Sequence, residues 1–213
     1  MIHFFGCSQT YGHCLPDCYV QPPKPKGIWD VDTADKPSEQ CFAAIVGREL
    51  GVNIKNHAWP GASNKYMWYK MINKQYDADD TVVCVWTLID RTYVIRKDDA
   101  FHLGVWDSPC KRNQAFRRYV AQNDSNENLE LDAFHLIDHA HRIVAPKVKK
   151  ILHYKMNPSL DNPPDWFTLK FVNSLCYMVP LGHDLALDGM HYGVESHKTI
   201  AKQMIQDLTT VPN

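Results

Sequence analysis

Residues 81–86 read Thr-Val-Val-Cys-Val-Trp, and this run indicates the fold more clearly than any other part of the chain. Its residues are β-branched or apolar at successive positions, which predicts a strand that is buried on both faces. Strands of this kind belong to parallel sheets that helices cover on each side. The neighbouring sequence should therefore alternate between short apolar strands and amphipathic helices.

Short apolar runs on both sides of residues 81–86 predict the other strands. They are residues 2–5, 52–55, 150–154 and a shorter candidate at 175–179. Segments with helical spacing of apolar residues lie between them, at 38–51 with Ser38 as its N-cap, 61–74, 129–145 and 195–208. This alternation predicts an α/β protein, built as a three-layer α/β/α sandwich around a mostly parallel central sheet.

The chain has 213 residues, which is the size of one ordinary domain. We therefore expect a single domain over residues 1–213. Two segments do not fit the alternation: a proline-rich irregular excursion at about 12–37, and a polar and aromatic insertion at about 92–128 without a clean period.

Charge and hydropathy exclude several classes of protein. Lys and Arg number 23 against 24 Asp and Glu, a formal net charge of -1, which argues against a general nucleic-acid binder. No apolar run is long enough to span a bilayer, so no membrane partner is expected. The first residues lack the basic and apolar regions of a secretory signal, which predicts a cytoplasmic location. In that setting the seven cysteines are expected to be mostly buried, reduced thiols.

Three loops should meet at one edge of such a sheet, because ligands of open α/β folds bind outside the carboxyl ends of the strands. The loop at 6–12 contains Ser8, the loop at 56–64 contains Gly61 and Asn64, and the loop at 187–193 contains Asp188 and His191. A serine nucleophile needs an imidazole to take its proton, a carboxylate to orient that imidazole, and donors for the oxyanion. Those residue types converge here.

The same loops resemble conserved blocks of the SGNH, or GDSL-type, serine hydrolases. FFGCSQTYG at 4–12 resembles the first block, NHAWPGASN at 56–64 the second, and LDGMHYG at 187–193 the last, in the family's order. The resemblance implies Ser8 as nucleophile, His191 as general base and Asp188 as the residue that orients His191. It also implies an oxyanion hole from the amides of Ser8 and Gly61 plus an asparagine side chain, and a sheet with flavodoxin-like strand order.

The third block departs from the family pattern. It should read roughly Gly-x-Asn-Asp after the central strand, but residues 87–90 read Thr-Leu-Ile-Asp, so Ile89 stands where the asparagine should be. Asn64 and Thr87 are the candidates to replace that donor. Losing one oxyanion donor typically costs about 10²–10³ in rate.

Simpler interpretations exist for each of these residues. Ser8 could be a turn or cap serine, Gly61 a turn residue after Pro60, and Asn64 the cap of the following helix. The Asp-x-x-His pattern occurs four times, at Asp99/His102, Asp132/His135, Asp138/His141 and Asp188/His191. Only its last copy lies in a glycine-containing loop just before a predicted helix, and we therefore favour that copy.

Two sets of potential metal ligands are weaker candidates. Cys14 and Cys18 near His13 could form half of a zinc site, but no second cysteine pair at metal spacing follows. His135 and His139 have the spacing of two ligands on one helix face, but the glutamate of the metalloprotease pattern is missing. We therefore expect no metal site.

The sequence is consistent with three functions. The first is a serine esterase that cleaves short-chain or acetyl esters of a small molecule or a glycan, without a cofactor. The second is a non-catalytic binding or structural module of the same fold, and the third is an acyltransferase that uses the same serine. An aromatic group beside the expected site could stack on a sugar or pack in the core; it comprises Trp59, Tyr66, Trp68 and Tyr69.

Overall fold

The structure is a computed structural model, and it describes residues 1–18, 35–95, 100–104, 111–123, 126–156, 160–180 and 183–211. Most of the proline-rich excursion, residues 19–34, lies outside the described residues. Among the described residues, every helix is too short or too polar to cross a bilayer.

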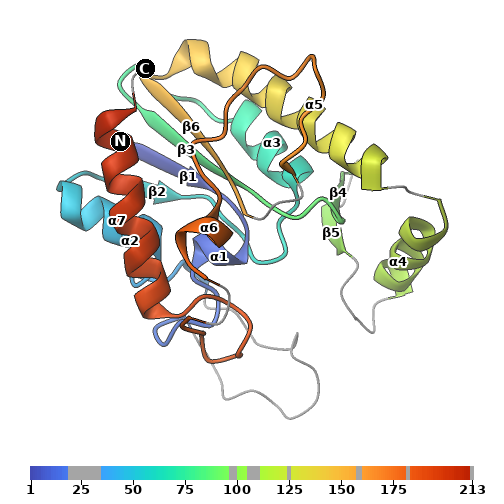
Figure 1. Cartoon of the computed structure of the whole chain (residues 1–213), viewed down its shortest axis with the longest axis horizontal. Helices are drawn as coiled ribbons and strands as arrows, with labels where there is room; N and C mark the ends of the chain where they lie inside the picture. The colour runs from blue at the N-terminus through green and yellow to red at the C-terminus, as the bar shows by residue number, and fades with distance from the viewer. Residues whose placement is uncertain are drawn as a thin grey trace.

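A four-stranded parallel sheet forms the centre of the protein (Figure 1). Its strands are β1 (Ile2–Phe5), β2 (Ile54–Asn56), β3 (Thr81–Trp86) and β6 (Lys150–Lys155), in the order β2-β1-β3-β6. Every pairing is parallel. The predicted parallel sheet and α/β class are confirmed, and the strands at 2–5 and 81–86 have the predicted bounds.

Helices cover both faces of this sheet, as the three-layer prediction requires (Figure 1). On one face, α2 (Phe42–Leu50) and α7 (Val194–Thr210) pack over a core that includes Phe4, Val83 and Ile200. On the other face, α3 (Asn64–Ile72) and α5 (Asn126–Val144) pack over a core that includes Trp86 and Ile137. Each face of the sheet thus packs against a core, and this explains why the central strands are apolar at successive positions.

The N-cap predicted for α2 is wrong, because the helix begins at Phe42 with Cys41 at its N-cap. Ser38 instead donates a hydrogen bond to Asp17 and accepts one from the Gln40 amide, which builds the turn before the helix. In α3 the cap is Ser63, whose hydroxyl accepts a hydrogen bond from the Tyr66 amide. Asn64, the cap considered from the sequence, is the first residue of the helix.

The strand predicted at 175–179 is wrong, because that segment forms α6 (Leu175–Met178). Leu175 and Val179 are buried and lie four residues apart, whereas Tyr177 between them is exposed. That spacing is helical, whereas a strand would alternate at every second residue. The preceding Ser174 makes a single parallel bridge to Lys155, so the sheet ends there.

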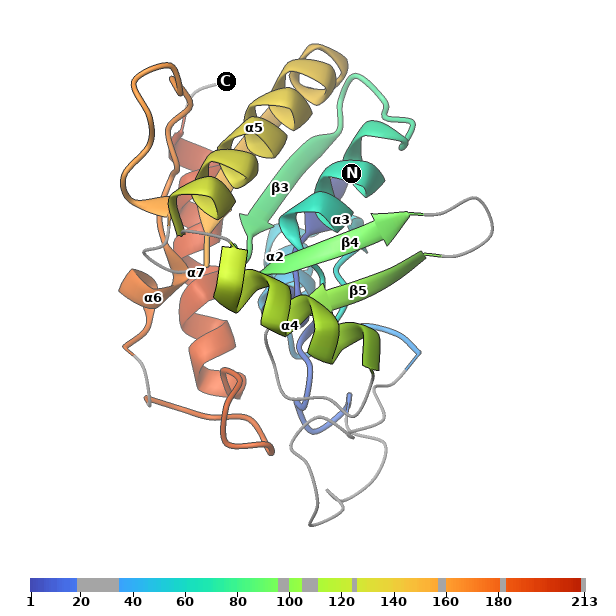
Figure 2. The same cartoon turned by 90° about the vertical axis from the view of Figure 1, so that its right-hand side faces the viewer.

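The predicted insertion at 92–128 has regular structure despite its irregular pattern (Figure 2). It contains an antiparallel pair, β4 (Arg91–Ile95) and β5 (Ala100–Gly104), followed by α4 (Lys111–Asn123) and the start of α5. Figure 2 shows the hairpin and α4 beside α3 and the first turns of α5. The smaller elements are α1 (Ser8–Tyr11) and η1 (Ala145–Lys147).

Two buried histidines have pKa values far below the ordinary value. Burial lowers the pKa of His153 and that of His197 to about 3. His197 Nδ1 accepts a hydrogen bond from the Phe42 amide at 3.0 Å, so protonation would set two donors face to face. His153 Nδ1 accepts one from Trp86 Nε1, also at 3.0 Å. Both imidazoles are therefore neutral in the folded protein at neutral pH.

We expect the free energy of unfolding to fall as the pH is lowered below about 6.5. The unfolded chain protonates these imidazoles near that pH, whereas the folded chain does so only near pH 3, so acid favours unfolding. The stabilisation is complete above pH 6.5, and each histidine contributes about 1.4 kcal/mol per pH unit below it. Urea unfolding of wild type and His197→Gln between pH 7 and 5 measures this slope. The slope of the unfolding free energy against pH should be smaller in the variant by about 1.4 kcal/mol per pH unit, the contribution of one proton. An equal slope in both proteins would contradict a neutral His197 in the folded protein.

Candidate active site

Ser8 lies directly beyond the end of β1, in a tight turn that only glycine at position 6 permits. A Cβ on Gly6 would lie 1.9 Å from Thr10 Oγ1, so any other residue would force the turn apart. Cys7 is the N-cap of α1, and Ser8 is the first residue of that short helix. The local sequence thus places the serine at the carboxyl edge of the sheet, where it is buried.

His191 and Asp188 lie on the loop before α7, and backbone contacts hold this loop against the α1 region. The Leu187 amide donates a hydrogen bond to the Cys14 carbonyl at 3.2 Å. The Tyr192 amide donates one to the Gln9 side chain at 3.1 Å. These contacts bring the two ends of the chain together, because Ser8 and His191 are 183 residues apart.

A continuous chain of hydrogen bonds joins the three side chains. His191 Nε2 lies 2.8 Å from Ser8 Oγ, and His191 Nδ1 lies 2.5 Å from Asp188 Oδ2. The other carboxylate oxygen of Asp188 accepts hydrogen bonds from the amides of Met190 and His191. Burial raises the pKa of the Asp188 carboxyl, but the bonds from His191 and these amides outweigh it and hold that pKa well below its ordinary value. Asp188 is therefore a carboxylate at neutral pH.

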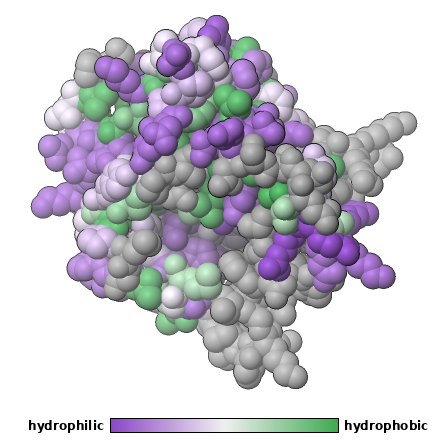
Figure 3. Space-filling view, turned by 45° about the vertical axis from the view of Figure 1, so that its right-hand side comes forward, coloured by the Kyte–Doolittle hydropathy of each residue, from purple (hydrophilic) through white to green (hydrophobic). Residues whose placement is uncertain are grey.

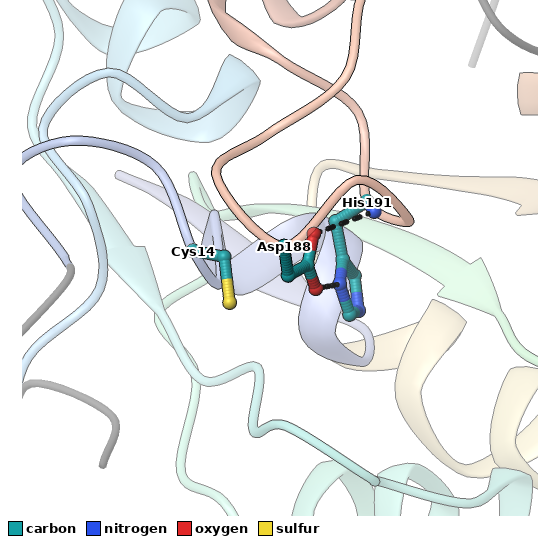
Figure 4. A group of neighbouring side chains, drawn as sticks. All are labelled: Cys14, Asp188 and His191. Atoms are coloured by element: carbon teal, nitrogen blue, oxygen red, sulfur yellow. Dashed lines mark hydrogen bonds and ion pairs between the residues drawn. The ribbon is translucent and has the colours of Figure 1, made fainter. Parts of the chain in front are cut away.

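Cys14 is the third side chain beside this carboxylate (Figure 4). Its Sγ, one carboxylate oxygen of Asp188 and one ring nitrogen of His191 all lie within 4.8 Å of one another. The residue is fully buried and has a φ of 63°, in the left-handed region that few non-glycine residues adopt. The pKa of the Cys14 thiol is raised to about 12, mainly by burial and secondly by the charge of Asp188. Cys14 is therefore a thiol at neutral pH.

The loop after β2 lies against the first loop, as the sequence predicts. The Trp59 amide donates a hydrogen bond to the Gly6 carbonyl at 3.3 Å. Gly61 follows in the same turn with a φ of 74°, a conformation that favours glycine. Within the described part of the chain, neither the Ser8 amide nor the Gly61 amide has a hydrogen-bond acceptor.

Asn64 binds the backbone of Thr87 on two sides. Its Oδ1 accepts a hydrogen bond from the Thr87 amide at 2.8 Å, and its Nδ2 donates one to the Thr87 carbonyl at 3.2 Å. Both residues are buried. Asn64 thus fixes the start of α3 to the end of β3, next to Ile89, which packs against the core between α3 and α5. Its role as an oxyanion donor, like that of Thr87, stays a prediction.

The two histidines considered as metal ligands, His135 and His139, each contact a tryptophan. The Trp68 indole donates a hydrogen bond to His139 Nδ1 at 2.8 Å, and His135 stacks on Trp166 with ring centroids 4.5 Å apart. The aromatic group is divided: Trp59 contacts Tyr11, whereas other members contact the hairpin. Those members are Tyr66 and Tyr69, which both contact Tyr93.

The sequence did not place two residues at this site: Cys14, considered only as a zinc ligand with Cys18, and Gln9. Cys14 lies beside Asp188 because of a left-handed turn that no glycine marks, and Gln9 orients the last loop through a long-range contact. His13 is a third neighbour, with its ring edge-on to that of His191 at 5.1 Å between centroids. The pKa of His13 is lowered to about 4, mainly by burial and secondly by the charge of His191. His13 therefore adds no positive charge at neutral pH.

Comparison with known proteins yields structural relatives only. No protein-family model matches the chain, and no curated protein matches it. Among solved structures, an α/β hydrolase enzyme from the metagenome of Lake Arreo is 14% identical, with a TM-score of 0.54 over 100% of this chain and 96% of its own. A member of the lipolytic G-D-S-L family from Veillonella parvula is 12% identical, with a TM-score of 0.50 and coverage of 99% and 98%.

The chain has the SGNH-hydrolase fold. A third similar structure is an acetyl xylan esterase from the rumen bacterium Butyrivibrio proteoclasticus, at 12% identity and a TM-score of 0.52. That match covers 97% of this chain but only 63% of the esterase, so this chain spans less than two thirds of its length. At these identities the likeness to SGNH hydrolases concerns the fold, and activity has to be argued from the site.

We expect Asn64→Leu to lower the free energy of unfolding by about 2–4 kcal/mol, because it leaves the buried amide and carbonyl of Thr87 without partners. Urea unfolding at pH 7 measures this change. Asn73→Leu is the matched control, since Asn73 ends the same helix and its amide bonds the exposed Tyr69 carbonyl. The control should change stability by less than about 1 kcal/mol. Equal effects of the two substitutions would contradict the role of Asn64.

Proposed function

We propose that this protein is a serine esterase that hydrolyses short-chain acyl esters with Ser8, His191 and Asp188 as its catalytic triad. The observation that carries the proposal is the hydrogen-bonded chain from Ser8 Oγ through both nitrogens of His191 to Asp188. A buried serine with its hydroxyl on an imidazole, and that imidazole on a buried carboxylate, is the arrangement that activates a nucleophile.

In the acylation half of the reaction, Ser8 Oγ attacks the ester carbonyl while His191 Nε2 takes the hydroxyl proton. Asp188 holds the Nδ1 proton and stabilises the imidazolium that forms. The C–O bond to the alcohol then breaks, and His191 returns its proton to the departing alkoxide. The acyl group is left on Ser8. In the second half, water attacks this acyl-enzyme, gives its proton to His191, and releases the acid as Ser8 regains its proton.

The developing oxyanion would be bound by the amides of Ser8 and Gly61. Their lack of acceptors among the described residues supports this role, and so does the contact between Trp59 and Gly6 that joins the two loops. Ile89 cannot donate from its side chain, so the third donor is missing at its family position. We expect a rate about 10²–10³ below that of a complete site, unless Asn64 or Thr87 supplies the donor.

The proposed substrate is an acetyl or other short acyl ester of a small molecule or a glycan. The acetyl xylan esterase among the structural relatives supports a carbohydrate-linked ester, as a likeness of fold at 12% identity. The proposed reaction uses side chains, backbone amides and water, and it requires no cofactor. Residues 1–213 are taken as one domain, with the 91–123 hairpin and helix as an addition to the fold.

We expect a fluorophosphonate probe to label wild-type protein with one adduct, seen as an intact-mass shift, and to leave Ser8→Ala unlabelled. Ser38→Ala is the matched control, because Ser38 is also buried but its hydroxyl bonds a carboxylate, Asp17, rather than an imidazole. It should label like wild type. Turnover of p-nitrophenyl acetate should fall by roughly 10⁴-fold or more in Ser8→Ala and in His191→Ala.

Labelling that persists in Ser8→Ala would disprove the proposed nucleophile. Far-ultraviolet circular dichroism and urea unfolding of each variant would separate loss of function from loss of fold. If wild type takes up no probe and cleaves no activated ester, the non-catalytic binding module becomes the better reading. Ile89 at the position of the family's asparagine is the observation that favours that alternative.

A further inference from the structure

A second candidate site lies in a cavity of about 540 Å³ between α3, β4, α4 and α5. Small-molecule sites typically measure roughly 300–1,000 Å³, so the cavity has the size for a ligand. Neither Ser8 nor His191 is among the described residues that line it. Figure 2 shows the hairpin and α4 on this side of the molecule, beside α3 and the first turns of α5. The insertion in the sequence therefore forms part of the cavity wall.

The floor of this cavity is apolar and includes one large aromatic ring. Ile89, Ala133 and Leu136 contribute aliphatic surface, and Trp68 contributes its indole. The indole is held in place, because its Nε1 donates a hydrogen bond to His139 Nδ1 at 2.8 Å. A fixed indole beside branched aliphatic side chains favours a flat apolar ring as the occupant.

Two basic residues are among the described residues that line the cavity. Lys65 and Arg91 are cationic, whereas Asp132 is the only carboxylate among the described lining residues. Arg91 Nη1 also donates a hydrogen bond to Thr87 Oγ1 at 3.4 Å, which anchors the guanidinium at the end of β3. Cations outnumber carboxylates among the described lining residues and Lys65 is exposed, so an apolar ring that carries a negative charge suits this lining.

Figure 3 shows this side of the molecule in part, and the residues that it colours are of mixed character. Hydrophobic residues form small groups set among hydrophilic ones.

Contacts connect this cavity to the segment that carries Ser8. Asn64 lines the cavity and binds the Thr87 backbone. Thr87 Oγ1 lies 3.8 Å from Met156 Sδ, and that sulfur lies 3.3 Å from Cys7 Sγ. The residue before the serine is thus linked to the cavity wall through two side chains. Ile89, which stands where the third-block asparagine is expected, forms part of the same wall.

We propose that the cavity binds a flat apolar ring bearing an acidic group, such as an aromatic carboxylate. This ring has two chemical sources: it is either one part of the ester that Ser8 cleaves, or a separate small molecule that binds beside the reaction. The first source rests on the proposed esterase activity, whereas binding itself does not.

Binding is tested by titration calorimetry of the 213-residue Ser8→Ala protein with 6-hydroxy-2-naphthoate, in the absence of any turnover. We expect saturable binding that weakens at least about tenfold in Ser8→Ala/Leu136→Trp, because the larger side chain fills the cavity. Lys65→Gln in the same background should weaken binding of the naphthoate about twofold to fivefold and leave neutral 2-naphthol unaffected. Lys70→Gln, on the same helix but outside the cavity, is the control and should match the parent protein.

Kinetics distinguish the two sources of the ring. If the ring belongs to the substrate, kcat/KM for 6-acetoxy-2-naphthoate relative to p-nitrophenyl acetate should fall about tenfold in Leu136→Trp. If the ring is a separate ligand, that ratio stays constant while 6-hydroxy-2-naphthoate changes the turnover of p-nitrophenyl acetate. No saturable binding at millimolar naphthoate, or equal affinities in all variants, would overturn the proposal. Absence of any esterase activity would refute the proposed function but leave the binding result valid.

Discussion

The parallel pairing of β1 with β2 on one side and with β3 on the other holds the carboxyl ends of three strands at one edge of the sheet. The register aligns Phe4 with Asn56 and with Val83, so all three strands end within a few residues of one another. The loops that follow carry Ser8, Gly61 and Thr87. The candidate site depends on this alignment, because no local contact would otherwise join segments eighty residues apart.

Much of this arrangement could be predicted from residue patterns. The apolar run at 81–86 has no polar face, so only a buried parallel strand satisfies it. Ser8 and His191 could be chosen because strand ends in such a sheet meet, although 183 residues separate them. The Asp-x-x-His pattern alone had no value, since four copies occur; the glycine-containing loop before a helix distinguished the copy at Asp188.

Features set by long-range packing could not be predicted. The segment at 175–179 is apolar enough for a strand, and only the burial of Leu175 and Val179 on one side makes it a helix. Among the described side chains of α4, only Phe116 and Val120 are partly buried, so the apolar stripe is too narrow to reveal a helical period. Cys14 beside Asp188 depends on a left-handed backbone angle, and such angles at residues other than glycine leave no trace in composition.

The departure at Ile89 connects the two candidate sites. A side chain there contributes either a hydrogen-bond donor at the end of β3 or an apolar surface toward the space between α3 and α5. An isoleucine contributes only the second. Asn64, one helical turn from the cavity floor at Trp68, keeps the end of β3 fixed through both of its bonds to Thr87, so the loop holds its shape without the family's asparagine. Ile89 thus extends the apolar lining of the cavity at the position where the SGNH pattern has a hydrogen-bond donor.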